Sequence, residues 1–574
     1  MAVVTTFFLA LSVGTLVVLV QSIILNINDP NTFTLMAAAC GFASLVGCLI
    51  LGLDGDMEMS VATRKTIAVF LSILWICGTA VMTFISPFTE TGNGYFGCWA
   101  ALIGALSITI DAWPKFRKAC RAEQLIAMLM LASSLVLAQT IMNCAKDEGF
   151  CTGLALWLIV CSIVSMLVCV FVLFSPRAVA VDRHFKFAAL FLCVWWTAGT
   201  IFATFDYPYI NTGNGYFGCW MAFGTSAMLM IDAWGLMGPG GMLQYASTIT
   251  GGTPVDLILV TMASTVTLLA SVVHCEEGEC ESLEAAAMMV SGLSLATCCA
   301  ILICKGAGWA SGRLAAAFPY VSAFLLALWL VGTGFMTFKQ PFRHTGNGFF
   351  GSWVALIAAW SLTRQSFEVL KRAFEQIGSQ GAEIACILLA SATLLLQASI
   401  DCADESIECE EHWAWAVACG TISLVACIII IVKFQMLSRV FKWVTLAMFA
   451  WWSGAIGALT FAWPYTKSGN AYFACWFAFC AAGLLVCVEW NLIGNVSRAT
   501  PTASPAPKSA VAQPVGVGKA VGPVADPTHV VQQPTVAQAP VKFVPMHIQA
   551  IPTLLVKKTP QAKEVSAVKG ESVV

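Results

Sequence analysis

Long apolar runs constrain this chain of 574 residues more than any other feature. Hydrophobic residues make up 59% of the sequence, charged residues only 10%, and the mean hydropathy is +0.83. A soluble domain has roughly 45–50% apolar and about 25% charged residues. The composition therefore excludes a soluble protein.

Sixteen of these runs are about 17–25 residues long, the length that crosses the hydrocarbon core of a bilayer as a helix. Lipid offers no hydrogen-bond partners to a backbone, so the runs are predicted to be transmembrane helices. The period-two alternation of a transmembrane barrel is absent. The predicted spans are 3–25, 32–53, 66–86, 96–113, 124–143, 152–174, 187–205, 216–235, 255–273, 284–304, 314–338, 349–363, 383–400, 413–432, 440–462 and 471–489.

A nine-residue motif occurs four times, once at every fourth span. It reads TGNGYFGCW at 91–99 and 212–220, TGNGFFGSW at 345–353 and SGNAYFACW at 468–476. A tryptophan lies 16 residues before each copy, at Trp75, Trp196, Trp329 and Trp452. A Thr-Phe pair and a proline followed by an aromatic residue also recur at fixed spacing. Such agreement indicates four copies of one module.

We therefore predict an all-α, polytopic membrane protein built from four repeated four-helix modules and a tail. The predicted modules are 1–121, 122–240, 252–375 and 382–495. Residues 497–574 contain 11 of the 21 prolines. A polar, proline-rich segment cannot bury enough apolar surface to fold, so this segment is predicted to be a disordered cytoplasmic tail.

The distribution of basic residues predicts the orientation. With a cytoplasmic N-terminus, the inner loops and helix ends carry 17 Lys and Arg residues, whereas the outer loops carry only Lys146, Lys339, Arg343 and Lys467. This excess follows the positive-inside rule. Both termini are therefore expected to be cytoplasmic, in the plasma membrane or an endomembrane.

Three outer loops between the first and second spans of a module carry a cysteine pair around acidic residues. The pairs are Cys144 and Cys151, Cys275 and Cys280, and Cys402 and Cys409. The non-cytoplasmic side is oxidising, so local disulfides are expected. Free thiols, or a divalent metal held by thiols and carboxylates, are the alternatives. No metal or other cofactor is assigned.

Each motif contains a Gly-Asn pair between the third and fourth spans. The asparagines are Asn93, Asn214, Asn347 and Asn470. Both residue types tolerate positive φ, and asparagine can cap a helix, so a tight turn and a cap are favoured. A polar ligand pocket is the alternative. The motif aromatics, such as Tyr95, Phe96 and Trp99, are typical of interfacial belts.

Intramembrane ionisable residues are the usual pointers to transport, and they are few here. Asp111 and Asp232 occupy equivalent positions near the inner end of a fourth span, where module three has Gln365 and module four has Val488 with Glu489 next to it. None of these residues forms a chain across the bilayer. Metalloprotease, hydrolase and Walker motifs are missing, so an enzyme is not expected. The formal net charge of −2 argues against a nucleic-acid partner.

The sequence ends in Glu571-Ser572-Val573-Val574, which matches a PDZ-type ligand. Such peptides add a strand to a sheet edge while backbone N–H groups hold the terminal carboxylate. A cytoplasmic PDZ-type partner is therefore one expectation, and an ordinary flexible end is the alternative.

Four spans with cytoplasmic ends, short outer loops and outer cysteine pairs resemble the MARVEL-type tetraspan family, which includes the physins and occludin. The resemblance is architectural and covers residues 1–490 as four tandem copies. It implies membrane apposition, vesicle traffic or lipid-domain organisation without catalysis. The expected function is thus a non-enzymatic membrane scaffold. The alternatives are a transporter or channel built from parallel repeats, and a receptor that uses the acidic outer loops.

Overall fold

The computed structural model describes residues 2–52, 60–113, 121–146, 151, 153–174, 183–236, 254–276, 280, 282–306, 311–377, 380–403, 409, 411–437 and 439–490. The predicted tail at 497–574 lies outside these residues. The described part is helical, and its only β-pairing is an isolated bridge between Gly92 and Lys467. The predicted all-α class is therefore confirmed.

Each predicted module corresponds to four successive long helices, although α7 and α17 begin one residue before the predicted starts of modules two and four. Module one contains α1 (Ala2–Asn28), α2 (Thr32–Gly52), α4 (Val61–Phe84) and α5 (Asn93–Ala112). Module two contains α7 (Arg121–Lys146), α8 (Gly153–Phe174), α9 (Arg183–Ile201), which continues into the π-helix η2 (Phe202–Asp206), and α10 (Asn214–Ala233). Module three contains α12 (Pro254–Glu276), α13 (Ser282–Gly306), α14 (Ser311–Phe338) and α15 (Asn347–Ser366). Module four contains α17 (Gly381–Cys402), α18 (Glu411–Leu437), α19 (Phe441–Ile456), which continues into the π-helix η4 (Gly457–Ala462), and α20 (Asn470–Glu489).

Fourteen of these helices are long and apolar enough to cross a membrane, which makes the chain an integral membrane protein. The two others are α10 and α15, the fourth spans of modules two and three. Each is 20 residues long but carries polar residues such as Ser226 in α10 and Arg364 in α15. A short helix that we did not predict, α16 (Glu368–Ile377), follows α15.

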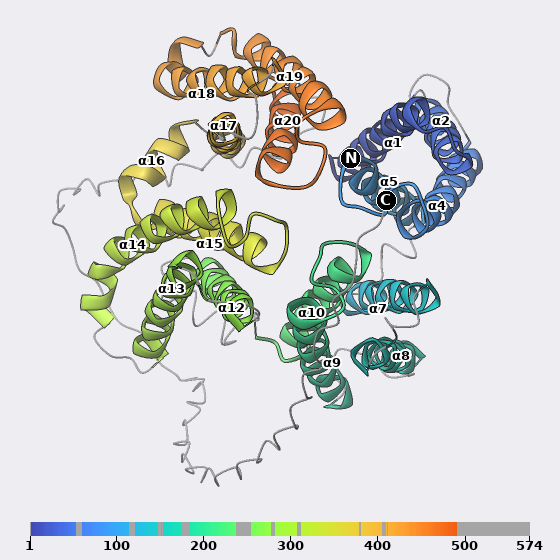
Figure 1. Ribbon diagram of the computed structural model, residues 1–574, viewed down its shortest axis with the longest axis horizontal. Helices are drawn as coiled ribbons and strands as arrows, with labels where there is room; N and C mark the ends of the chain where they lie inside the picture. Colours follow the sequence, from blue (N-terminus) through green and yellow to red (C-terminus); the bar gives the residue numbers. More distant parts are fainter. Residues whose placement is uncertain are drawn as a thin grey trace, which may run out of the picture. The chain divides into compact units, whose positions relative to one another are not determined.

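The helices of each module pack around a hydrophobic core of their own. The first span packs against the second and the fourth, and the third packs against the fourth, in all four modules. Figure 1 shows this grouping for α1, α2, α4 and α5. The four modules belong to one compact unit, Met1–Arg498.

A completely buried tryptophan of the third span lies at the centre of each core. Its indole nitrogen donates to a serine of the second span, and that serine bonds to a hydroxyl of the first span. The indole bonds are Trp75–Ser44 (2.8 Å), Trp196–Ser165 (2.9 Å), Trp329–Ser294 (2.8 Å) and Trp452–Ser423 (3.1 Å). The hydroxyl bonds are Ser44–Thr15 (2.9 Å), Ser165–Ser133 (3.0 Å), Ser294–Ser264 (2.8 Å) and Ser423–Ser391 (2.8 Å).

This hydrogen-bonded triad ties three spans together where the hydrophobic effect cannot. Lipid tails are as apolar as leucine, so helix association in a membrane depends on packing and on hydrogen bonds between helices. A small residue three positions after the tryptophan brings the second span close. A Cβ added to Gly78 or Gly199 would lie 3.0 Å from the sulfur of Cys40 or Cys161.

We predict that Ser165→Ala destabilises the protein by about 1 kcal/mol, because it leaves the buried Trp196 indole without an acceptor. Ser162→Ala is the matched control. Ser162 is equally buried on the same helix, but its hydroxyl has no hydrogen-bond partner among the described residues. Unfolding of both variants in detergent is the measurement. Equal stability of the two variants would contradict the assigned role of the triad.

Candidate functional site: the joints between modules

The repeated motif lies at the contact between successive modules. Its asparagine is the first residue of the fourth span, and the preceding glycine is the N-cap. The φ angles of these glycines are −172°, 171°, 179° and 177°, which is extended backbone that needs no glycine. The asparagine side chains bond to a neighbouring module, which differs from the capping role that the sequence favoured.

The asparagine amide nitrogen donates to a threonine of the preceding module, at the end of its third span. The bonds to the threonine carbonyl are Asn93–Thr460 (2.8 Å), Asn214–Thr83 (3.0 Å), Asn347–Thr204 (2.8 Å) and Asn470–Thr337 (2.9 Å). The hydroxyl of the same threonine lies 3.1–3.4 Å from the amide nitrogen. All four asparagines are buried.

The asparagine carbonyl oxygen accepts a bond from a motif tryptophan of the same preceding module. The bonds are Trp99–Asn214 (3.3 Å), Trp220–Asn347 (3.0 Å), Trp353–Asn470 (3.0 Å) and Trp476–Asn93 (3.0 Å). The last bond joins module four to module one, so the four modules form a closed cycle. We call each of these contacts a joint, and the side of the protein that carries them the motif face.

Two further rings of side chains close the cycle. The motif hydroxyls bond one another, at Thr91–Thr212 (3.1 Å), Thr212–Thr345 (3.0 Å), Thr345–Ser468 (3.1 Å) and Ser468–Thr91 (2.7 Å). The second ring is formed by Phe96, Phe217, Phe350 and Phe473, whose neighbouring centroids are 5.9–6.2 Å apart with planes inclined by 58–62°. These motif aromatics therefore pack between modules, and the interfacial belt is not their role.

In modules one, two and three, the glycine after the asparagine makes room for the aromatic residue that follows the repeated proline. A Cβ on Gly94 would lie 2.2 Å from the ring of Phe88, and one on Gly348 would lie 2.4 Å from Phe342. In module four the corresponding residues are Ala471 and Tyr465. The close approach of backbone and ring explains why the motif is nearly invariant at this position within the chain.

A glutamine of the first span is a third partner of the asparagine in three modules. The bonds are Asn93–Gln21 (3.4 Å), Asn214–Gln139 (3.3 Å) and Asn470–Gln397 (3.3 Å). Gln139 and Gln397 then donate to Asn143 (2.8 Å) and Asp401 (3.0 Å), one helical turn nearer the surface. Module three has Ala270 and His274 at these two positions.

The joint between modules three and four contains a buried carboxylate. Asp401 is 5% exposed and accepts from the hydroxyl of Tyr465 (3.2 Å), and Arg343 of module three lies 3.6 Å away. Burial, and then the nearby Asp401 carboxylate, raise the pKa of Tyr465 above its ordinary value. The phenol is therefore protonated at neutral pH and donates to Asp401. This joint thus adds an ion pair between modules to the asparagine bonds.

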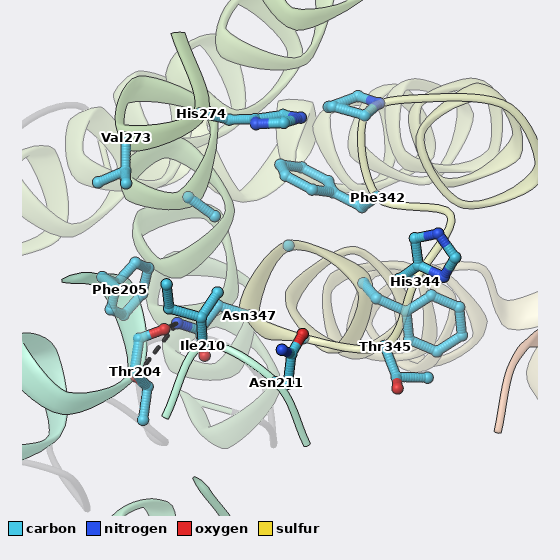
Figure 2. Close-up of a pocket in the computed structure, with 15 residues that line it drawn as sticks. Thr204, Phe205, Ile210, Asn211, Val273, His274, Phe342, His344, Thr345 and Asn347 are labelled. Carbon is cyan, nitrogen blue, oxygen red and sulfur yellow. Dashed lines mark hydrogen bonds between the residues drawn. The ribbon is translucent and has the colours of Figure 1, made fainter. Parts of the chain in front are cut away.

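Grooves accompany two of the joints. One lies between modules one and two and is lined by Gln139, Asn143 and Lys146 among others. The other lies between modules two and three and has a volume of about 170 Å³. Figure 2 shows His274, Phe342, His344 and Asn347 around the second groove.

Polar residues near the other ends of the fourth spans of modules two, three and four bond to the start of the first span of the same module. Asp232 pairs with Arg121 at 2.8 Å, and Gln365 donates to Asp256 at 2.8 Å. Gln380 donates to Glu489 in the same way. These contacts connect the start of the first span to the end of the fourth.

The three expected cysteine pairs are disulfide-bonded in the structure, at Cys144–Cys151, Cys275–Cys280 and Cys402–Cys409. Most residues between the paired cysteines lie outside the described part of the chain. Within the described part, no group of three His, Cys, Asp or Glu side chains is placed to hold a metal ion.

Comparison of the chain with protein-family models, curated proteins and solved structures finds no match. The candidate site therefore depends on the geometry of the joints alone.

We predict that Asn347→Ala destabilises the protein by about 1–3 kcal/mol, because it removes the bonds to Thr204 and leaves the Trp220 indole without its acceptor. Asn211→Ala, at an exposed asparagine of the same groove, is the control and should leave stability unchanged. Thermal unfolding in detergent measures both. A destabilisation of the same size in the two variants would argue against the joint.

Proposed function

We propose that this protein is a non-enzymatic scaffold that organises a membrane, with both termini in the cytoplasm. Its role would be in membrane apposition, trafficking or lipid-domain organisation, as the resemblance of its modules to MARVEL-type tetraspans implies. One observation carries this proposal: the modules are tied in a closed cycle, and four phenyl rings, each in contact with the next, form a closed ring of their own.

The joints favour a rigid assembly over a moving one. Alternating access requires one repeat to rock against another around a central site. Here each module is bonded to both neighbours through buried asparagine and partly buried tryptophan side chains. Rocking would break several of these bonds at once, in surroundings where unpaired polar groups are costly.

A channel is the second candidate, because the fourth spans of all four modules meet at one place. The phenyl rings of Phe96, Phe217, Phe350 and Phe473 would then be its gate. Further along the fourth spans, exposed residues such as Ile103 and Ile357 are apolar. Apolar side chains along the fourth spans favour contact with lipid over contact with water, and this supports the scaffold proposal over the channel.

We predict that liposomes containing the purified protein are impermeable to K⁺, Cl⁻ and small neutral solutes. The variant with all four phenylalanines replaced by alanine should remain non-conducting, because apolar residues continue beyond the ring. Flux through the wild-type protein would overturn the scaffold. Flux through the variant alone would favour the gated channel. As the positive control, a pore-forming peptide should release dye that is trapped inside the same liposomes.

We also propose a cytoplasmic PDZ-type partner for the sequence Glu571-Ser572-Val573-Val574, which lies outside the described residues. A tail peptide ending at Val574 should capture PDZ domains of the class that reads a C-terminal Val with a Ser two positions earlier. Addition of one glycine after Val574 should abolish capture, because the carboxylate no longer fits the backbone N–H nest. Capture that survives the extra glycine would exclude this mode.

A further inference from the structure

The short helix α16 (Glu368–Ile377) connects the last span of module three to the first span of module four. It is a separate helix and not a continuation of α15, because Phe367 between them has an extended backbone with φ −103° and ψ 114°. The main contacts of α16 are with α15 and α17, the two spans that flank it in the sequence. The chain therefore leaves the direction of α15 before it enters α17.

Both ends of α16 are held at one polar level of the protein. Gln365, three residues before the helix, donates at 2.8 Å to Asp256 at the start of the first span of module three. Gln380, three residues after the helix, donates to Glu489 at the end of the fourth span of module four. Ionisable side chains are costly in the hydrocarbon core, so such pairs mark the membrane surface. The helix thus starts and ends at the membrane surface opposite the motif face.

The sequence of α16, EVLKRAFEQI, separates into an apolar and a polar face at the helical period of about 3.6 residues. The apolar residues follow the spacing i, i+1, i+4, i+5 and i+8, at Val369, Leu370, Ala373, Phe374 and Ile377. The opposite face carries Glu368 and Arg372, which pair at 3.3 Å with both side chains exposed. The acids and bases of the helix balance. The helix is therefore amphipathic but carries no net charge.

Something outside the described part of the chain must cover the apolar face of α16. Val369 is 79% exposed among the described residues. A helix of ten residues is marginal in water on its own, so its stability must come from packing of the apolar face. The lack of net charge disfavours a partner held by opposite charge. Bilayer lipid, in contrast, is already present at both ends of the helix and offers an apolar surface.

We propose that α16 is an interfacial helix that lies in the membrane leaflet opposite the motif face. Val369 and the apolar residues in register with it contact acyl chains just below the phospholipid headgroups, and Lys371 and Arg372 face water. The occupant of the apolar face is thus phospholipid. This placement requires only that α15 and α17 reach the same membrane surface, so it holds for a scaffold and for a channel alike.

Photo-crosslinking of the full-length protein in phosphatidylcholine liposomes tests this placement. The photoreactive residue p-benzoylphenylalanine replaces Val369 in one variant and Lys371, on the opposite side of the helix, in the other. We expect about fivefold more lipid adduct from position 369 than from position 371, because only the first position faces the acyl chains. Mass spectrometry of the digested protein identifies each adduct as lipid, a second copy of the protein, or the chain's own tail.

Hydrogen exchange of the α16 amides in the same liposomes is an independent measurement. In Val369→Gln we expect exchange to become about tenfold faster, because the loss of one apolar contact with lipid weakens insertion. Lys371→Gln introduces the same residue on the polar face and is the matched control, with an expected change of less than about twofold. Unchanged exchange in α12 and α14 of both variants shows that module three remains folded.

Three results would overturn the proposal. They are lipid adducts that are absent or equal at the two positions, adducts of position 369 with a second copy or with the tail in place of lipid, and equal exchange rates in Val369→Gln and Lys371→Gln. Lipid adducts concentrated at position 369, together with faster exchange in Val369→Gln alone, would support the interfacial helix.

Discussion

The side chain of the motif asparagine determines how the modules are arranged. A buried carboxamide is costly unless both of its ends are paired. At each joint the two ends bond to the same preceding module, the nitrogen to a threonine and the oxygen to a tryptophan. Two fixed partners define the distance and the rotation between modules. The hydroxyl and phenyl rings can form only because these joints bring the four motifs together.

The four modules are related in sequence, yet the structure alternates around the cycle. Modules two and four end their third span in a π-helix and have a tyrosine after the repeated proline, whose hydroxyl bonds to Thr140 or Asp401. Modules one and three continue as α-helix and have Phe88 and Phe342 there. The tyrosine modules thus carry polar contacts beside their joints, and module three carries an apolar wall with a histidine. Equivalent joints have therefore diverged in chemistry.

The sequence was sufficient to predict what depends on local rules. Helix positions follow from apolar length, and the disulfide partners follow from cysteines that lie close together in one loop. It was not sufficient for the joints, because their partners lie 115–383 residues apart. The spacing of Thr83, Asn93 and Trp99 was visible in all four copies. A repeat shows that positions matter in every module, but it does not show whether they bond within a module or across to the next.

The hydrogen bonds of the joints lie on the motif face, together with the ion pairs of Lys467 with Glu90 and of Arg343 with Asp401. On the opposite side, the polar pairs such as Arg121 with Asp232 connect spans of one module. Each module therefore has a core and a set of polar contacts that do not require its neighbours. The joints then add a second level of structure, and the bond from module four to module one needs no covalent linker at all. This joint has the same geometry as the three joints between modules that follow each other in the chain. The complementary surfaces of the modules therefore close the cycle, and the connecting chain is not needed for it.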